Sequence, residues 1–341
     1  MMRRLTVLAV LVGAVASLFA AAATTARTAP RSSKGVTLRL VAYSTPKPVM
    51  AVLIKAFQKT AAGQGVSFTQ SYGSSGSQAR ALAAGQPADI AFLSTGLDID
   101  TVAAAGLISK DWAAAPYNGI AADSQVVFVV RKGNPKNIQT WADLVKPGVQ
   151  VVTPDPFTSG SAKWNILAAY GAQRKAGKTD KQAVAYVQKL FKNVVEQDSS
   201  GANALTTFLS GKGDVLLTYE SEAIAARLAG DPVQFVVPNP TMLIQLPMVP
   251  LLASQNLGTA QAFIKWIHTT QAQEILARGG YQPVEKKALA KYHWKFLPKG
   301  RALFSISDKL FGGWLKANKT WFDLSTGRMV AIEKAVGGPT T

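Results

Sequence analysis

The sequence predicts an α/β protein built on parallel sheets, and three observations lead to this prediction. Segments with the two-residue apolar period of strands alternate with segments that repeat apolar residues at helical spacing. A Ser/Gly-rich loop joins a strand to a helix three times, at residues 73–78, 158–161 and 199–202. The 341 residues, 48% of them hydrophobic, suffice for two domains. Since ligands in such folds lie beyond the carboxyl ends of the strands, the three loops mark a candidate binding site.

The first third of the chain alternates strands with short helices. Alternating apolar residues predict a strand over Thr37–Tyr43, and Pro46 opens a helix whose apolar stripe reaches Phe57. Ser75 and Gln78 have the spacing of a capping box at the start of the next helix. Further strands are predicted at residues 66–72, 89–93 and 126–131, and a further helix at residues 99–105.

The stretch from residue 148 to 171 has the strongest pattern in the chain. Val149, Val151 and Val152 predict a buried strand, and two prolines after it forbid the strand from continuing. The Ser/Gly loop then opens a helix that is expected to end at Gly171. The start of a helix has up to four unpaired backbone N–H groups and the positive pole of the helix dipole, so this stretch predicts an anion-binding surface.

The remaining chain continues the alternation. Strands are predicted at residues 194–195, 215–218, 233–237 and 247–253, and helices at residues 180–191, 259–276 and 304–318. Glu220 and Glu222 are expected to be acids in the first turn of a helix, where the dipole favours them, rather than ligands. Lys163 and Arg80 are expected to be solvated, whereas core positions are expected for Trp141, Trp164 and Trp314.

The N-terminus has the pattern of a secretory signal peptide. Arg3 and Arg4 precede an uncharged apolar run over residues 5–23, and small residues predict cleavage near Ala23 or Ala26, which makes residues 1–26 the signal peptide. A retained membrane anchor is the alternative, because the run is nearly long enough to span a bilayer. The mature protein is expected in the periplasm or another extracytoplasmic location.

Cysteine content and charge exclude some functions. The chain has no cysteine, which excludes disulfides, thiolate chemistry and a lipid anchor on an N-terminal cysteine. Its formal charge is +18, which steers anions toward it without identifying them. No metal or cofactor is expected, because neither His268 nor His293 has a cysteine or a paired histidine nearby in a metal-binding pattern.

Several motifs between residues 37 and 314 match a known family. They include Ser71-Tyr-Gly-Ser-Ser-Gly-Ser-Gln-Ala-Arg80, Thr158-Ser-Gly-Ser-Ala-Lys-Trp-Asn165, Tyr219-Glu-Ser-Glu-Ala223 and Phe311-Gly-Gly-Trp314. Together they resemble the periplasmic sulfate-binding proteins of bacterial ABC importers. The resemblance implies a two-lobed periplasmic-binding-protein-like fold, in which each lobe is a mostly parallel sheet flanked by helices and the ligand lies between the lobes. Lobe one would comprise residues 36–119 and 246–341, and lobe two residues 120–245.

The resemblance also implies which residues bind sulfate. The serine of the first Ser/Gly turn falls on Ser75, and the second helix opening falls on Ser159, Gly160 and Ser161, the last in place of a family glycine. The third turn places a backbone donor at Gly201 or Ala202. Tyr219 stands where the family has a tryptophan, and Ser44 where many members have an aspartate. The partners implied are sulfate or a similar oxyanion and the membrane permease of an ABC importer, with a monomeric protein and no nucleic acid.

Neutral donors are chemically sufficient for such a ligand. Uncompensated burial of a dianion costs tens of kcal/mol, whereas about six hydrogen bonds to a charged group contribute roughly 10 to 18 kcal/mol. We therefore expect Ser75, Ser159, Gly160, Ser161 and Tyr219 to form the donor shell, without direct contact from lysine or arginine. Phosphate carries a proton near neutral pH and would need an acceptor, which such a shell lacks.

Other functions stay open on the sequence alone. Thiosulfate, selenate, chromate and molybdate differ from sulfate mainly in size. An exported hydrolase is a second class, although the chain has only two histidines and neither Gly-x-Ser-x-Gly nor Ser-x-x-Lys. A polyanion-binding protein is a third, because aromatic residues such as Tyr292 and Trp294 lie within the basic run from Lys286 to Arg301.

Overall fold

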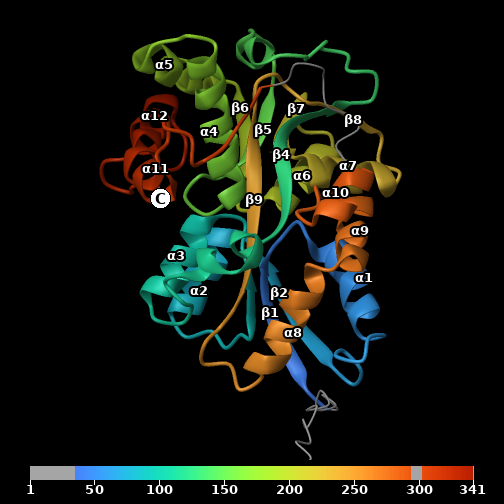
Figure 1. Ribbon diagram of the computed structural model, residues 1–341. Helices are drawn as coiled ribbons and strands as arrows, with labels where there is room; N and C mark the ends of the chain where they lie inside the picture. Colours follow the sequence, from blue (N-terminus) through green and yellow to red (C-terminus); the bar gives the residue numbers. More distant parts are fainter. Residues whose placement is uncertain (1–34, 293–301, 341) are drawn as a thin grey trace, which may run out of the picture. The chain divides into compact units, whose positions relative to one another are not determined.

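The computed structural model describes residues 35–292 and 302–340 (Figure 1). The predicted signal peptide, residues 1–26, and the part of the basic run from His293 to Arg301 lie outside the described residues. Within residues 35–292 and 302–340, no helix has the length and apolar character needed to cross a membrane.

Strands and helices alternate along the described chain, as the sequence predicts. The strands are β1 (Thr37–Tyr43), β2 (Ser67–Gly73), β3 (Ile90–Phe92), β4 (Ile120–Arg131), β5 (Val151–Pro154), β6 (Val194–Asp198), β7 (Val215–Tyr219), β8 (Val233–Val236), β9 (Thr241–Pro250) and β10 (Leu303–Phe304). The helices are α1 (Lys47–Phe57), α2 (Ser75–Ala83), α3 (Gly96–Ala104), α4 (Gly160–Lys175), α5 (Asp180–Lys192), α6 (Gly201–Leu209), α7 (Glu220–Leu228), α8 (Leu257–Ile267), α9 (Thr270–Arg278), α10 (Lys286–Tyr292), α11 (Trp314–Trp321) and α12 (Arg328–Val336). Short 3-10 helices are η1 (Trp112–Ala114), η2 (Pro116–Gly119) and η3 (Trp141–Val145).

The strands form one mixed sheet in the order β2-β1-β3-β9-β4-β7-β5-β6. The parallel pairs fall into two groups of strands. In the first group β1 pairs with β2 and β3, and in the second group β5 pairs with β6 and β7. The long strands β9 and β4, which run side by side in Figure 1, connect the groups through antiparallel pairs. The α/β fold is therefore confirmed, with antiparallel strands where the chain passes from one group to the other.

The predicted amphipathic segments bury their apolar faces. On α1 the buried residues are Val49, Met50, Leu53, Ile54 and Phe57, which is the stripe that the helical spacing predicts. Trp141 and Trp164 lie in the core as expected, whereas Trp314 is only half-buried and packs against it.

Three predicted boundaries are wrong, two of them because of contacts with residues far away in the sequence. Helix α4 passes through Gly171, where a Cβ would overlap with the ring of Phe304, so this glycine allows close packing rather than ending the helix. The long helix predicted at residues 259–276 is two helices, because the Thr269 side chain accepts from Ala272 N–H and caps α9. The helix predicted at residues 304–318 begins only at Trp314, after β10 pairs with β9.

The fourth wrong boundary concerns β9. The strand predicted at residues 247–253 begins at Thr241, and its first half pairs with β4. Pro247 is tolerated within the strand because it stands opposite Ile120, next to an irregularity in the register.

Candidate functional site

Three helices begin next to one another at the carboxyl ends of the strands. The N–H of Gly76 in the first turn of α2 donates to the carbonyl of Thr158, just before α4, over 3.1 Å. A Cβ on Gly201, the first residue of α6, would lie 3.4 Å from the Ser161 hydroxyl oxygen of α4. The positive dipole ends of the three helices therefore converge, as an anion site requires.

A group of buried hydroxyls surrounds these helix starts. Within the described residues, five of these hydroxyls have no hydrogen-bond partner, those of Tyr43, Thr45, Ser94, Ser161 and Tyr219. They come from the end of β1, the segment after β3, the start of α4 and the end of β7. A buried hydroxyl without a partner costs about 1–3 kcal/mol, so the cluster suits a ligand that accepts hydrogen bonds.

Tyr219 presents its hydroxyl to this group from the end of β7. The side chain is fully buried, and its ring centroid lies 6.3 Å from that of Tyr43. Burial raises the pKa of Tyr219 well above its usual value, against a smaller opposing effect of the Ser94 and Ser161 hydroxyls. Tyr219 therefore keeps its proton and remains a donor at physiological pH.

Ser159, Gly160 and Ser161 form the start of α4. Ser159 occupies the N-cap position, yet its side chain does not cap the helix, so its hydroxyl is not committed to the first turn. A Cβ on Gly160 would overlap with the Ser94 hydroxyl oxygen and lie 3.2 Å from Asp98 Oδ2. Only glycine fits at this position, because its missing side chain lets the start of α4 lie close to Ser94 and Asp98.

Ser75 has a role that differs from the predicted capping box. The N-cap of α2 is Ser74, and Ser75 is the first helical residue. The Ser75 hydroxyl donates to Asp98 Oδ2 over 2.5 Å, while the Gln78 amide donates to the Ala42 carbonyl and the Ser71 hydroxyl. The capping-box prediction is wrong because both side chains bond to residues outside α2. The Ser75 hydroxyl proton is thereby committed to Asp98, which leaves the backbone N–H of Ser75 as its donor toward the site.

Ser44, Gly201 and Ala202 meet where β1 ends beside α6. The N–H of Ala202 donates to the Ser44 hydroxyl over 3.4 Å. The Ser200 side chain caps α6 by accepting from Asn203 N–H at 3.3 Å. Of the two alternative donors Gly201 and Ala202, the second therefore already has a partner.

Several residues of the site were not predicted, among them Tyr43, Thr45, Ser94 and Asp98. Ser94-Thr95-Gly96 opens α3 as a fourth Ser/Gly helix start, and Thr95 caps that helix by accepting from Asp98 N–H at 3.1 Å. The three-residue spacing of Thr95 and Asp98 is the sequence signal for this start.

Three charged residues are buried, and for Lys163 this contradicts the prediction of a solvated position. Glu220 and Glu222 are 0% and 5% exposed, and Lys163 is 6% exposed. Burial raises the pKa of Glu222 to about 7, against the opposing Thr218 hydroxyl. Burial also lowers the pKa of Lys163, with nearby Asp98 opposing it. Their helices present these faces to the interior because they start beside the other strand ends. Arg80 is exposed, as predicted.

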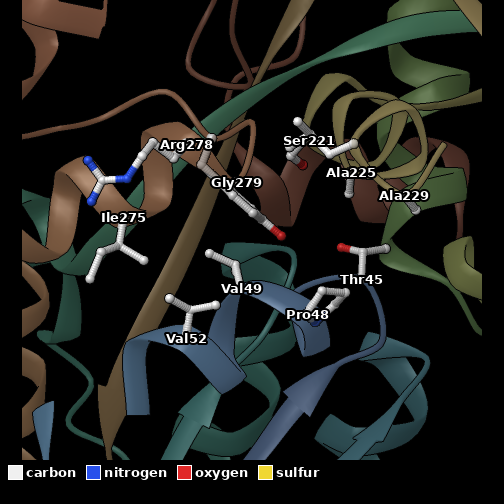
Figure 2. A pocket seen from close by; sticks show the side chains of 12 residues that line it. Thr45, Pro48, Val49, Val52, Ser221, Ala225, Ala229, Ile275, Arg278 and Gly279 are labelled. Atoms are coloured by element: carbon white, nitrogen blue, oxygen red, sulfur yellow. The ribbon is translucent and has the colours of Figure 1, made fainter. Parts of the chain in front are cut away.

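An apolar pocket of about 420 Å³ adjoins the hydroxyl group at Thr45 (Figure 2). Its walls come from α1, α7 and α9, and Figure 2 shows Pro48, Val52 and Ala225 around it. The one charged residue lining it, Arg278, is paired with Glu274 at 3.4 Å. The mainly apolar walls do not suit a dianion, so the hydroxyls and helix starts are the better candidate site.

His268 is held by a backbone carbonyl and an aromatic ring. The His268 Nε2 lies 2.9 Å from the Ile120 carbonyl, and its ring stacks on Tyr117 at 4.8 Å between centroids. In residues 35–292 and 302–340, no three His, Cys, Asp or Glu side chains are grouped to hold a metal ion. His293, the other histidine, lies outside the described residues.

Comparison with known proteins identifies the family of the chain. Residues 38–282 match the family model described as bacterial extracellular solute-binding protein. A sulfate-binding protein of Salmonella typhimurium is 38% identical over 303 residues, 85% of this chain and 91% of the relative. A thiosulfate-binding protein of Pseudomonas aeruginosa is 36% identical over 294 residues, 83% of this chain and 88% of the relative. The solved structure of the sulfate-binding protein SubI from Mycobacterium tuberculosis is 42% identical, has a TM-score of 0.81, and the match covers 84% of this chain and all of that one.

Proposed function

The chain belongs to the bacterial extracellular solute-binding proteins, and on that premise we propose that it captures sulfate for an ABC importer. The observation that carries the proposal is the convergence of the α2, α4 and α6 N-termini with buried, unpartnered hydroxyls. A tetrahedral dianion accepts hydrogen bonds on every side, which such a shell of donors satisfies.

The proposed shell consists of uncharged groups. Its hydroxyl donors are those of Ser159, Ser161 and Tyr219, and its backbone donors are Ser75, Gly160, Ser161 and Gly201. Ser44 positions α6 by accepting from Ala202 N–H. Lys163 lies in the first turn of α4. Its positive charge is attracted by the carboxyl groups of Asp98 and Asp155, which oppose the lowering of its pKa by burial. It therefore contributes no direct contact with the anion.

This shell is strong enough for tight binding. About six hydrogen bonds to a charged group contribute roughly 10 to 18 kcal/mol, and association costs several kcal/mol. The difference corresponds to a Kd of about 1 μM or lower. Thiosulfate is the alternative ligand, favoured by the relative of that name in Pseudomonas aeruginosa.

The proposed lobes follow the two strand groups. Lobe one comprises residues 36–119 and 246–341, and lobe two residues 120–245. This division is supported by the strands β4 and β9, which lead from one group into the other. Helices α11 and α12 lie against α3 and α5, so the C-terminal segment contacts both groups. Closure of the lobes would bring the donors of both around the anion.

The physiological setting follows from the same proposal. The protein is exported through its N-terminal signal peptide, works as a monomer outside the cytoplasm, and delivers the anion to a membrane permease. It is a binding protein rather than an enzyme and needs no cofactor.

Calorimetric titration of the mature protein with sulfate, thiosulfate, molybdate and phosphate tests the proposal. We expect a Kd of about 1 μM or lower for sulfate, little change with added salt, and at least tenfold weaker binding of phosphate. Absence of sulfate binding contradicts the proposed function. A steep loss of affinity with salt would instead favour an exposed polyanion site.

A further inference from the structure

The apolar pocket of Figure 2 has hydroxyl groups in one part of its wall. These belong to Thr45, Ser221 and Tyr281. The Tyr281 hydroxyl faces those of Thr45 and Ser221, and burial raises the pKa of Tyr281 to about 12, so this phenol keeps its proton. The Thr45 hydroxyl is buried and has no hydrogen-bond partner among the described residues. This part of the wall therefore offers donors to a ligand that accepts hydrogen bonds.

Thr45 also touches the proposed anion site. Its methyl carbon Cγ2 lies 3.2 Å from the point where a Cβ on Gly201 would be, at the start of α6. The Ser161 hydroxyl oxygen, at the start of α4, lies 3.4 Å from the same point. The pocket and the anion site therefore meet at Thr45, with no more than a side chain between them.

The rest of the pocket suits an apolar group. Helix α1 contributes Pro48, Val49 and Val52, and α7 contributes Ala225 and Leu228. Val52 and Leu228 are 53% and 68% exposed, so apolar side chains at the pocket are in contact with water. A ligand that covers them gains roughly 25 cal/mol for each Å² of apolar surface removed from water. Polar donors and apolar walls together suit a ligand with an anionic head and an apolar tail.

We propose that the site also binds small alkanesulfonates, with the sulfonate group at the starts of α4 and α6 and the alkyl chain beyond Thr45 in the apolar pocket. The inference rests on the proposed function, because the sulfonate group takes the place of sulfate. A sulfonate, R–SO3⁻, has three acceptor oxygens and carries no proton at physiological pH, so the same donors suit it. Its fourth substituent is carbon, which gains from an apolar wall and needs no donor.

Arg278 is the other group near the pocket that attracts a sulfonate, but it would hold the ligand in a different place. Its guanidinium is paired with Glu274 at 3.4 Å and donates to the Tyr292 hydroxyl at 3.2 Å. The Arg278 side chain is 57% exposed, and ion pairs at such positions contribute little. Competition distinguishes the two places, because a sulfonate at the helix starts excludes sulfate, whereas one held by Arg278 leaves sulfate bound.

Competition calorimetry of the mature protein with sulfate and the straight-chain sulfonates from methane- to butanesulfonate tests the inference. Methanesulfonate should displace sulfate and bind at least about tenfold more weakly, because at least one hydrogen bond to a charged group is lost. Each further methylene enters the pocket, so the affinity should rise about threefold per methylene and about 30-fold from methane- to butanesulfonate.

Two variants of the pocket wall locate the alkyl chain. Ala225→Leu fills the pocket and should remove most of the rise with chain length while sulfate affinity stays unchanged. Ala185→Leu is the matched control, because Ala185 is exposed on α5, a helix that contributes no residue to the pocket wall. Val52→Ser changes an exposed position and should weaken butanesulfonate binding about threefold, again without an effect on sulfate.

The inference is overturned if butanesulfonate binds no more tightly than methanesulfonate, if it binds without displacing sulfate, or if the rise with chain length persists in both pocket variants. Should Ala225→Leu also lose sulfate binding, Val52→Ser decides alone. Failure of the wild-type protein to bind sulfate contradicts the proposed function instead, so the two failures are distinguishable.

Discussion

The indole N–H of Trp164 on α4 donates to the backbone carbonyl of Ser94, just after β3, over 2.7 Å. Trp164 is fully buried and its ring meets that of Trp314 edge to face at 4.6 Å. In the proposed division Trp164 belongs to lobe two and Ser94 to lobe one. The bond therefore joins the first turns of α4 to the segment after β3, across the proposed lobe boundary.

Replacing Trp164 by phenylalanine should accelerate sulfate release. The variant keeps an aromatic ring but loses one hydrogen bond between the lobes, worth about 0.5–1.5 kcal/mol, so the dissociation rate should rise about two- to tenfold. Stopped-flow measurement of release tests this. Trp141→Phe is the matched control, because Trp141 donates its indole N–H to the Pro240 carbonyl at 2.8 Å within lobe two. Equal effects of the two variants on release would contradict the role of Trp164.

Alanine at position 160 should abolish tight binding. The added methyl group would overlap with the Ser94 hydroxyl oxygen, so α4 must move away from the segment after β3. We expect sulfate affinity to fall at least about 100-fold, as for the loss of two hydrogen bonds to a charged group. Gly258→Ala on α8 is the control, since no atom lies within 4 Å of its added Cβ. Calorimetry measures the sulfate affinity of both variants. Unchanged affinity in Gly160→Ala would contradict the claim that a side chain at this position displaces the start of α4.

Loss of the Tyr219 hydroxyl should weaken sulfate binding more than it destabilises the fold. Tyr219→Phe removes one donor to a charged ligand, worth roughly 1.5–3 kcal/mol, which raises the Kd about 10- to 150-fold. The hydroxyl has no partner among the described residues, so the melting temperature of the free protein should hold or rise. Tyr186→Phe should do the reverse, because Tyr186 donates to the Trp141 carbonyl at 2.5 Å. Titration and thermal melting together separate these outcomes.

Gly171→Ala should destabilise the protein although alanine favours helices. Helix propensity alone predicts a gain of about 1 kcal/mol for this change in α4. The added Cβ would overlap with the Phe304 ring and lie 3.0 Å from the Phe311 ring, which forces both aromatic rings to shift. We expect a net loss of about 1–3 kcal/mol in denaturant unfolding, as for overpacking in a core. A gain in stability would contradict this prediction, because it would mean that the Phe304 and Phe311 rings can move away from the added methyl group at little cost.

The free energy of unfolding should fall as the pH rises from about 4.5 to about 7, because the buried Glu333 carboxyl loses its proton over this range. This α12 residue is fully buried, and burial raises its pKa to about 7 against the opposing amide of Gln197. A carboxyl whose folded pKa is raised stabilises the fold below its unfolded pKa, and this contribution, on the order of 1–3 kcal/mol, is lost as pH passes the folded value. Asp123 and Glu222 have raised pKa values in the same direction. The difference between wild type and Glu333→Gln in unfolding experiments isolates the effect, and parallel pH profiles would contradict it.

Local patterns in the sequence were enough for most of the alternation of strands and helices and for the starts of the three helices that follow the Ser/Gly loops. The apolar stripe of α1 and the valine-rich strand before α4 depend on periodicity, which neighbouring residues encode. The Ser/Gly loops also consist of residues that are typical of turns and helix starts. The fold class and the meeting of the three loops could therefore be predicted.

The errors arose where contacts with residues far away in the sequence determine the local structure. Ser75 has the spacing of a capping box, but its hydroxyl bonds to Asp98, 23 residues further along the chain. Gly171 resembles a helix end, yet it makes room for an aromatic ring more than 100 residues away. The burial of Lys163 likewise depends on strand ends that only the folded chain brings together.

The most direct test of the central claim is a crystal structure of the sulfate complex. We predict sulfate oxygens within about 2.7–3.2 Å of the backbone nitrogens of Gly160 and Ser161 and of the Tyr219 hydroxyl, with no ammonium or guanidinium group in contact. Sulfate bound elsewhere, or held by the Lys163 or Arg80 side chain, would contradict it.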